Sequence, residues 1–599
     1  MKQFFTLLIA MLTLPVWAVA QGWPANYSGV MLQGFYWDSY TDTQWTKLEA
    51  QADDLSPYFS LIWVPQSGYC NTLTNQMGYA PIWWFDHKSA FGTETQLRSM
   101  IQTFKAKGTG IIEDVVINHR NGNTNWCDFP TETWKGKTST WTLADICKGD
   151  DGGKTEAQGY HLTGATDTGD DFDGARDIDH TSLNAQKNIK TYLDFLLNDL
   201  GYTGFRYDMV KGYAAKFIGI YNGSAKPQFS VGEYWDNAAS IKSWINGTQV
   251  DGTPTSAAFD FPMKYAINEA LGNGQWNRLA ETALANDAAY SRYAVTFVDN
   301  HDTGRSSSDG GAPLYANIAA ANAYILAMPG TPCIFLSHWK AHKTIIKKLI
   351  TARRAVGVTN QSSILGATAQ AGGFVLTTQG TVGKVLLLLG TTTGVNTSGY
   401  QLAVEGENFK YYVSDHVDIS AIGKIKDDTP TFAAPDFCQV DKGETCAFFE
   451  APTGWTQTVY CWRWDNTHNY TGNHWPGVAC TRVGTTATGK AVWKWSWNKT
   501  SIASPASNAG IIFSNNGSPQ TANLAFTNGG YYDLDGLKGT VKPTTTGIAA
   551  DITTDHQGQT TNVYTVDGRL VRRNASATTP LQGLAKGIYI VDGKKYVVE

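Results

Sequence analysis

The sequence is poor in charged residues. Asp, Glu, Lys and Arg make up 17% of its 599 residues, against about 25% in an average soluble protein. A net charge of −5 provides no basic footprint, so we expect no nucleic-acid partner. The eight cysteines include no C-x-x-C motif, which argues against a zinc or thioredoxin-like site. Aromatic residues reach 12%, with 21 Trp and 28 Tyr, and such a composition suits a neutral ligand rich in hydroxyl groups.

Beyond the N-terminus, the chain also lacks any apolar run long enough to cross a bilayer, so we expect no transmembrane span. At the N-terminus itself, Lys2 precedes a short apolar run, and the small residues Ala18 to Ala20 follow. This pattern predicts a secretory signal peptide over residues 1–20. We therefore expect a secreted protein, extracellular or attached to the cell surface.

Export permits disulfide bonds between some of the eight cysteines. Buried free thiols are the alternative, most of all for Cys333, which lies in an apolar run. Local spacing favours the pairs Cys438–Cys446 and Cys461–Cys480, and Cys127 and Cys147, which lie in one long loop, could also pair.

Strand-like and helix-like runs alternate from about residue 28 to 355. This alternation predicts an α/β fold, a parallel (β/α)8 TIM barrel, with an inserted lobe at about 119–181 after the third strand. The eight apolar runs that we assign to strands are 30–37, 61–66, 110–119, 204–210, 229–235, 257–263, 294–301 and 331–338. All-β domains follow. The expected division is 1–20 signal peptide, 21–355 barrel with its lobe, 356–450 antiparallel β domain, 451–540 Trp-rich β-sandwich module, and 541–599 linker and C-terminal β tail.

Three of these strand runs have a carboxylate at or next to their C-terminal ends, namely Asp208, Glu233 and Asp302. Parallel barrels place function at the C-terminal ends of their strands, and a pair of carboxyl groups is what glycoside hydrolysis requires. Each carboxylate alone could be a helix cap or a surface ion partner. Three of them on separate strands, with Arg206, His119 and His301 alongside, favour an active site.

The residues around two of these carboxylates predict different roles. Arg206 and Asp208 are two apart on one strand and so share a face, where the guanidinium would keep Asp208 ionised as a nucleophile. Glu233 lies among Val231, Tyr234 and other apolar residues, which would raise its pKa and keep it protonated as a general acid. Carboxyl groups about 5–5.5 Å apart would make such an enzyme retaining.

Four segments resemble the signature segments of the α-amylase family of glycoside hydrolases. They are DVVINH (114–119), GFRYDMVKGY (204–213), VGEYW (231–235) and FVDNHD (297–302). Lys211-Gly212 and DFDGARDIDH (171–180) are similar to the plant and archaeal α-amylases in particular. The resemblance implies retaining hydrolysis of internal α-1,4 bonds in starch-like glucans. A transglycosylase with the same site, or a non-catalytic starch-binding protein, remains the alternative.

The resemblance also implies roles for individual residues. Asp208 would be the nucleophile, Glu233 the acid/base, and Asp302 a third carboxylate that binds sugar hydroxyls. Arg206 would orient the nucleophile within the substrate-binding site. The residues implied to bind the sugar are Tyr79, His119, Lys211 and His301. The resemblance further implies a structural Ca²⁺ between lobe and barrel. Asn118, Asp177 and the carbonyl of Gly212 match the family's ligand positions, and such oxygen ligands suit this ion. Asp167 and Asp171 lie in the same Asp- and Gly-rich loop and could serve this or a second ion. A solvated acidic loop is the alternative.

The Trp-rich segments 459–477 and 492–497 resemble starch-binding modules of family 26. Alternation places Tyr460, Trp462 and Trp464 on one face, with Trp475 on a nearby loop, where aromatic faces could stack on sugar rings. The alternative is that some of these Trp form the core of a small β-sandwich. The C-terminal tail resembles sorting or surface-attachment tails of Bacteroidetes type. We expect a monomer whose partner is a starch-like polysaccharide.

Overall fold

The computed structural model describes most of the chain. The described residues are 22–149, 151–426, 432, 434–441, 443–465, 468–486, 489–497, 509–534, 536–541, 560–565, 569–576, 580–591 and 594–598. The predicted signal peptide lies outside them. In the described residues no helix is long and apolar enough to cross a membrane.

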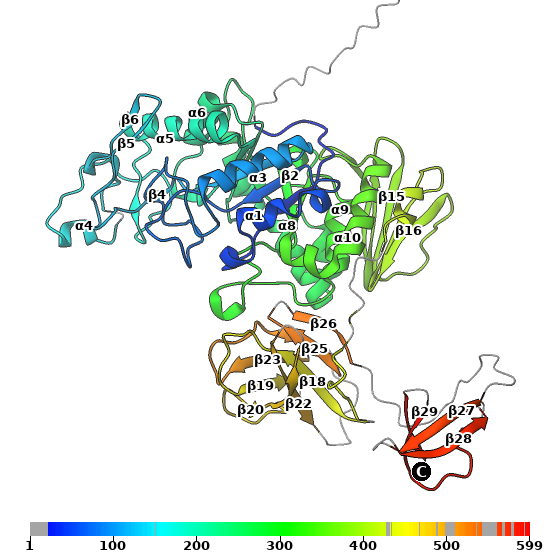
Figure 1. Cartoon of the computed structure of the whole chain (residues 1–599). Helices are drawn as coiled ribbons and strands as arrows, with labels where there is room; N and C mark the ends of the chain where they lie inside the picture. Colours follow the sequence, from blue (N-terminus) through cyan, green and yellow to red (C-terminus); the bar gives the residue numbers. More distant parts are fainter. Residues whose placement is uncertain are drawn as a thin grey trace, which may run out of the picture.

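Eight parallel strands close into a barrel in the order β1-β12-β11-β10-β9-β8-β3-β2. Figure 1 shows the barrel and its helices in the colours from blue to green. Each of the eight predicted runs contributes one strand, because continuous apolar and β-branched stretches can be buried on both faces of a parallel sheet. The TIM barrel is therefore confirmed. The strands are β1 Met31–Gln33, β2 Leu61–Val64, β3 Gly110–Val115, β8 Gly204–Tyr207, β9 Phe229–Gly232, β10 Ala257–Phe259, β11 Ala294–Phe297 and β12 Thr331–Phe335.

Helices cover the barrel. The helix α3 begins at a capping box in which Thr93 and Gln96 exchange hydrogen bonds, and it packs Leu97, Ile101 and Phe104 inward. The helices of the barrel are α1 Trp45–Glu49, α2 Ala52–Leu55, α3 Glu94–Ala106, α5 Leu183–Phe195, α6 Lys216–Ala225, α7 Ala238–Gly247, α8 Phe261–Ile267, α9 Ile318–Ala327 and α10 Leu336–Val356.

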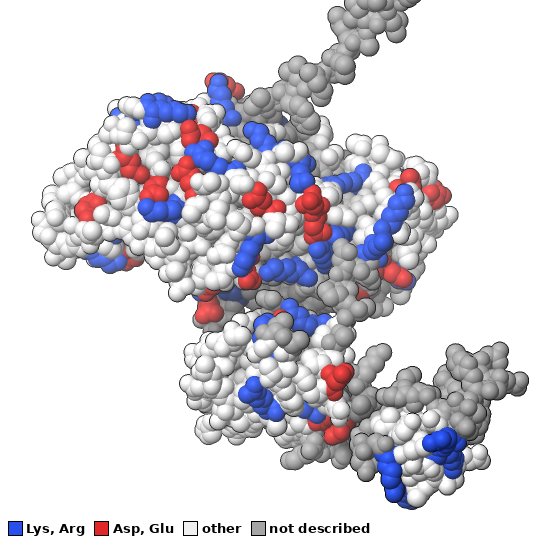
Figure 2. All heavy atoms as spheres, viewed as in Figure 1, with Lys and Arg blue, Asp and Glu red and all other residues white. Residues whose placement is uncertain are grey.

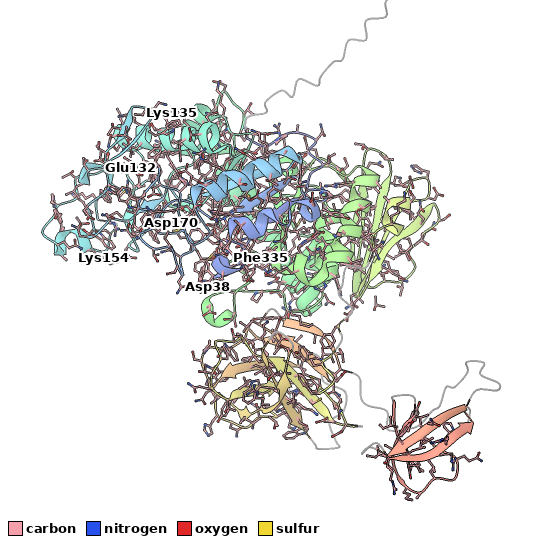
Figure 3. The ribbon with its side chains drawn as sticks, in the orientation of Figure 1. Asp38, Glu132, Lys135, Lys154, Asp170 and Phe335 are labelled. Atoms are coloured by element: carbon pink, nitrogen blue, oxygen red, sulfur yellow. The ribbon has the colours of Figure 1, made fainter. Side chains whose placement is uncertain are left out.

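A lobe is inserted between β3 and α5. Its stem is a short antiparallel pair, β4 His119–Arg120 with β7 Arg176–Asp177. It also contains the hairpin β5 Glu132–Trp134 and β6 Lys137–Ser139, and the helix α4 Lys154–Ala157. Figure 3 marks the lobe by Glu132, Lys135 and Lys154, and it marks Asp170 where the lobe approaches the barrel.

All-β units follow the barrel. A five-stranded antiparallel sheet has the order β13-β14-β15-β17-β16, and its strands are β13 Ser363–Gln370, β14 Gly372–Gln379, β15 Lys384–Thr391, β16 Tyr400–Gly406 and β17 Phe409–Ser414. The C-terminal sheet has the order β28-β27-β29-β30, with β27 Thr560–Thr565, β28 Leu570–Ser576, β29 Gly587–Val591 and β30 Lys594–Val598.

Between them lies a module of two sheets, β21-β22-β18-β25-β26 and β20-β19-β23-β24. The strand β18 Thr445–Glu450 pairs with β22 Ala491–Trp497 and β25 Gly530–Asp533. It therefore belongs to this module, and the boundary predicted after residue 450 is too late. The other strands are β19 Val459–Trp464, β20 Val478–Ala479, β21 Thr481–Thr485, β23 Gly510–Asn515, β24 Leu524–Ala525 and β26 Gly536–Thr540.

Two further features bear on the sequence-based expectations. All eight cysteines lie in the described ranges and no disulfide joins them, so none of the three expected pairs is bonded. On the face shown in Figure 2, Lys and Arg are interspersed with Asp and Glu on a mostly uncharged surface. This distribution agrees with the low content of charged residues.

Candidate active site

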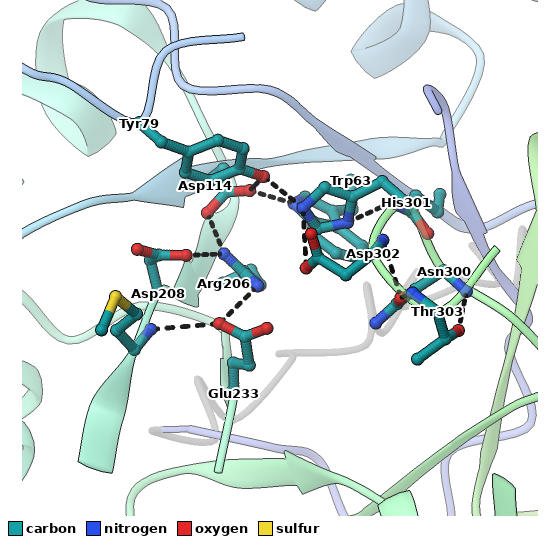
Figure 4. A network of polar contacts seen from close by, with 12 residues as sticks. Trp63, Tyr79, Asp114, Arg206, Asp208, Glu233, Asn300, His301, Asp302 and Thr303 are labelled. Atoms are coloured by element: carbon teal, nitrogen blue, oxygen red, sulfur yellow. Dashed lines mark hydrogen bonds and ion pairs between the residues drawn. The ribbon is translucent and has the colours of Figure 1, made fainter. Parts of the chain in front are cut away.

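One buried guanidinium connects three carboxyl groups at the C-terminal face of the barrel (Figure 4). Nη1 of Arg206 lies 2.7 Å from Oδ1 of Asp114 and 2.6 Å from Oδ1 of Asp208, and Nη2 lies 2.8 Å from Oε2 of Glu233. The four residues come from the neighbouring strands β3, β8 and β9 or the positions directly after them. Parallel pairing brings them together, since Arg206 is in register with Asp114 and Val231.

Asp208 and Glu233 differ in pKa, and therefore in protonation state near neutral pH. Burial raises the pKa of Asp208 to about 6, although the positive charge of Arg206 opposes the shift. Burial raises the pKa of Glu233 to about 8, again against Arg206. The backbone N–H of Met209 also donates to Oε2 of Glu233 over 3.1 Å. Near neutral pH the site therefore offers one ionised carboxylate and one protonated carboxyl side by side.

The third carboxylate comes from the turn after β11. The side chain of Asn300 accepts hydrogen bonds from the backbone N–H groups of Asp302 (3.0 Å) and Thr303 (2.8 Å), which fixes this turn. Oδ2 of Asp302 lies 3.3 Å from Nε2 of His301. The turn therefore presents Asp302 and His301 to the same side of the cleft.

A chain of hydrogen bonds links this turn to β3. Nε2 of Gln33 donates to Nδ1 of His301 over 3.0 Å, so the ring proton sits on Nε2, which lies 2.6 Å from the hydroxyl of Tyr79. That hydroxyl in turn donates to Oδ2 of Asp114 over 2.8 Å. Burial lowers the pKa of His301 to about 4 and so keeps the ring neutral. The imidazole of His301 and the ring of Tyr79 are thereby held in fixed orientations.

These groups open into a cavity of about 430 Å³. Its lining residues are Trp37, Tyr79, His119, Asp170, Phe172, Asp208, Met209, Lys211, Gly212, Glu233, Trp235, His301 and Asp302. The three predicted carboxylates, and the predicted sugar contacts Tyr79, His119, Lys211 and His301, therefore share one cavity. Arg206 is fully buried beside it and contacts Asp208 and Glu233 directly.

His119 and Lys211 occupy different surroundings. Nε2 of His119 donates to the backbone carbonyl of Tyr79 over 2.9 Å, while its Nδ1 is buried without a hydrogen-bond partner among the described residues. Burial lowers the pKa of His119 to about 4, so Nδ1 is a free acceptor. Nζ of Lys211 lies 3.1 Å from Asp236 and 3.5 Å from Asp170.

Several site residues were missed by the sequence reasoning. One of them is Asp114, which lies inside the segment 114–119. A carboxylate within a buried strand is unusual, and this could have marked Asp114 as a site residue. Its other partners are the indole N–H of Trp63 (3.2 Å) and the hydroxyl of Tyr79. Trp37 is parallel to Tyr79 within 3°, with ring centroids 5.9 Å apart. The guanidinium of Arg305 lies 4.5 Å from the Trp37 ring. No local pattern marks these pairs, because their members are far apart in the sequence.

Most of the predicted calcium ligands converge where the lobe meets the barrel. Both polar side-chain atoms of Asn118 are buried without a hydrogen-bond partner among the described residues, as is Oδ2 of Asp167. Gly212 lies against Asn118, since a Cβ on Gly212 would be 1.9 Å from Oδ1 of Asn118. Ligand atoms of Asp167, Asp177 and the unpredicted Cys147 lie within 4.8 Å of one another. Asp171 is exposed. This oxygen-rich set fits Ca²⁺.

The loop that carries Asp167 is fastened to the turn that follows Asp208. The backbone N–H of Asp170 donates to the carbonyl of Lys211 over 2.9 Å, and that of Ala214 donates to the hydroxyl of Thr168 over 3.0 Å. The lobe is therefore attached directly to the segment that follows Asp208.

The Trp-rich module presents an aromatic face. Along β19 the side chains alternate, with Tyr460, Trp462 and Trp464 partly exposed and the residues between them buried. Trp475 is 43% exposed, and its ring centroid lies 6.0 Å from that of Trp462. The predicted face is confirmed, while Trp495 is in the core of the module.

Comparison with known proteins agrees with this fold and site. The family model "Alpha amylase, catalytic domain" matches residues 63–338, and that of starch-binding module 26 matches residues 447–526. These matches define a starch-acting glycoside hydrolase. "Probable alpha-amylase 2" of Arabidopsis thaliana is 32% identical over 359 residues, which cover 56% of this chain and 82% of the relative. The chain belongs to the α-amylase family, and the resemblance seen in the sequence is confirmed.

Other similar proteins cover different shares of the chain. "Alpha-amylase 3, chloroplastic" of Arabidopsis thaliana is 29% identical over 331 residues, which are 52% of this chain and 35% of that protein. A solved structure of an α-amylase from Geobacillus thermoleovorans, complexed with acarbose, is 15% identical to this chain, with a TM-score of 0.46. The match covers 64% of this chain and 98% of the other.

Proposed function

We propose that the chain is a secreted α-amylase that hydrolyses internal α-1,4-glucosidic bonds of starch with retention, through a covalent glycosyl-enzyme intermediate. The observation that carries this proposal is the Arg206 guanidinium, which holds Asp208 and Glu233 next to each other. Retaining glycosidases need two carboxyl groups close together and in opposite protonation states. The shared Arg206 cation holds the two carboxyl groups close together, and burial keeps Glu233 protonated.

In the first step Asp208 attacks the anomeric carbon of the sugar in the cleft. The bond from that carbon to the glycosidic oxygen breaks as Glu233 gives its proton to the departing oxygen. Arg206 supports this step because it keeps Asp208 ionised and oriented. Glu233 retains its proton because burial raises its pKa to about 8.

In the second step Glu233, now ionised, takes a proton from water, and the water oxygen attacks the same carbon. The bond to Asp208 breaks, and Glu233 is protonated again. Asp302 would bind sugar hydroxyls and favour the distorted ring of the transition state. Tyr79 and His301 would surround the same sugar, and Nδ1 of His119 would accept a hydrogen bond from a sugar hydroxyl. Lys211, which lines the same cavity, would also bind the glucan.

A resident Ca²⁺ would be held by Asn118, Asp167, Asp177 and the carbonyl of Gly212, with Asp171 nearby. Bound there, the ion would supply the positive charge that these oxygens face. Hydrogen bonds of the neighbouring Thr168 and Asp170 already connect the loop of Asp167 to the turn after Asp208. The role proposed for the ion is therefore structural, as a tie between lobe and active site.

The units outside the barrel would serve export, starch binding and attachment to the cell surface. We propose that residues 1–20 direct export, and that the module that begins with β18 binds starch through Trp462, Trp464 and Trp475. The domain at 356–426 would pack on the barrel, and the C-terminal tail would mediate surface attachment. The protein would act as a monomer.

A product assay on soluble starch tests the proposal. Hydrolysis raises the number of reducing ends while the iodine colour is lost, and proton NMR of the first product should show the α-anomer. Asp208→Asn should abolish both signals. Loss of iodine colour with few new reducing ends would support a transglycosylase instead. Equal, slow sugar release by wild type and Asp208→Asn would overturn the catalytic assignment.

A further inference from the structure

A fully buried ion pair lies beneath the turn that carries Asp302. Nζ of Lys264, on α8, lies 2.7 Å from Oδ1 of Asp299, and the two side chains are 0% and 1% exposed. Nζ also donates to the side-chain oxygen of Asn268 and to the carbonyl of Ala312, over 2.9 Å in each case. All three protons of Lys264 therefore have acceptors.

The carboxylate of Asp299 reaches both ends of the segment 303–314. Its Oδ1 accepts from the hydroxyl of Thr303 (3.2 Å), and its Oδ2 accepts from the backbone N–H of Leu314 (3.1 Å). Nε2 of His338, on α10, lies 3.4 Å from the same Oδ2. The backbone N–H of Ala312 donates to the carbonyl of Thr303 over 2.9 Å and closes the segment. Lys264 and Asp299 therefore hold its start and its end.

Thr303 connects the segment 303–314 to the backbone of Asp302. Its hydroxyl accepts from the backbone N–H of Asn300 over 3.0 Å, and its own N–H shares the Asn300 side-chain oxygen with the N–H of Asp302. The backbone of Asp302 is thus fixed through Asn300 and Thr303, whereas its side chain is 28% exposed in the cleft.

Stability alone is a poor reason for such a pair, because well-packed apolar residues can replace a buried ion pair without loss. The contacts of this pair concentrate on one loop, and that loop carries a carboxylate of the cleft. We infer that Lys264 is a positioning residue for the reaction, which acts through Asp299 and Thr303 to hold Asp302 against the sugar. This inference rests on the proposed role of Asp302.

A double-mutant cycle with Asp302→Asn tests the inference. The substrate is an aryl maltooligoside with a good leaving group, so that slow variants remain measurable. Lys264→Met should lower kcat by up to about 10²-fold, the loss that a small misplacement of a reacting group can cause, and KM should change little. In the Asp302→Asn background the same substitution should have almost no further effect. Lys264→Arg should restore part of kcat.

Thr303→Val provides a second, milder variant, because it removes the hydroxyl contact and leaves the ion pair in place. It should show the same dependence on Asp302, and it decides the question if Lys264→Met fails to fold. Lys347→Met is the matched control. It breaks the ion pair of Lys347 with Asp54, whose Nζ–Oδ1 distance is 2.8 Å, outside the cleft lining, and should leave kcat unchanged.

Losses that are equal in the two backgrounds, or a rise in KM at constant kcat, would overturn the inference. A folded Thr303→Val with wild-type kcat would do the same. If Asp302→Asn alone retained full activity, the proposed function of Asp302 would be wrong, and this outcome is distinct from a failure of the role of Lys264.

Discussion

Oε2 of Glu233 lies 2.8 Å from Nη2 of Arg206, on the same guanidinium whose Nη1 holds Asp208. A positive charge next to a carboxyl group would by itself favour its ionised form. Burial has the larger effect, so the pKa of Glu233 is still raised to about 8. The same cation therefore contacts both carboxyl groups, and Glu233 still keeps its proton at neutral pH.

This balance predicts a bell-shaped dependence of kcat/KM on pH. Asp208 must be ionised, so activity should fall as the pH drops through its pKa of about 6. Glu233 must be protonated, so activity should also fall as the pH rises through its pKa of about 8. Initial rates across both values would check this. A glycosyl fluoride, whose leaving group needs no proton, should lose the alkaline limb, and an unchanged limb would contradict the role of Glu233.

Asp114 should influence the acidic limb. Its negative charge contributes to the raised pKa of Asp208, so Asp114→Asn should move the acidic limit of kcat/KM to lower pH. The weaker hold on Arg206 should also lower kcat by roughly 10-fold or more. The control is Asp260→Asn, a buried carboxylate that caps α8 outside the cleft lining. An acidic limit that stays in place would show that the two carboxylates do not interact.

Calcium should stabilise the protein through the residues at the junction of lobe and barrel. Calcium at about 100 times its dissociation constant should add about 2.7 kcal/mol of stability, seen as a higher melting temperature that a chelator reverses. Asp167→Asn should weaken this response, whereas Asp415→Asn, at an exposed carboxylate, should keep it. An Asp167→Asn protein that responded like wild type would exclude Asp167 as a ligand.

We expect the aromatic face of the module to contribute to binding of insoluble starch and not to turnover of short soluble substrates. Trp475→Ala should weaken binding to starch granules by roughly 10-fold, about 1.4 kcal/mol, because one stacking platform is lost. Turnover of a short soluble maltooligosaccharide should stay unchanged. Tyr160→Ala, at an exposed aromatic residue of the lobe, is the matched control. Granule binding that survives both Trp475→Ala and Trp462→Ala would place the binding face elsewhere.

Glu113 should make the stability of the barrel depend on pH. Burial raises its pKa from an ordinary 4.5 to about 8, and its carboxyl accepts hydrogen bonds from the N–H and hydroxyl of Ser67. A raised carboxyl pKa means that its stabilising contribution is complete below pH 4.5 and is lost as the pH rises to about 8. The loss can reach about 1.4 kcal/mol per pH unit.

Glu113→Gln should therefore flatten the fall of the melting temperature between these two pH values. Glu407→Gln, at an exposed side chain, should leave the fall as it is in wild type. Parallel curves for wild type and Glu113→Gln would mean that Glu113 ionises normally in the folded protein.

The sequence by itself determined the barrel, the three cleft carboxylates and the aromatic face of β19. Each depends on a local pattern: a continuous apolar run for a strand buried on both faces, a polar residue where that run ends, and a period of two for a half-buried strand. Burial and backbone geometry impose these patterns within a few residues, so they can be read without knowing the fold.

Only the tertiary structure decided which groups meet. Asp114 with Arg206, Trp37 with Tyr79, and Lys264 with Asp299 join residues that are 35 to 92 positions apart. The inclusion of β18 in the starch-binding module and the absence of disulfides were decided in the same way, by pairing and packing between distant segments. The physical reason is that the distances which set pKa values, ion pairs and ring contacts are created when the barrel closes, and they leave no local trace in the chain.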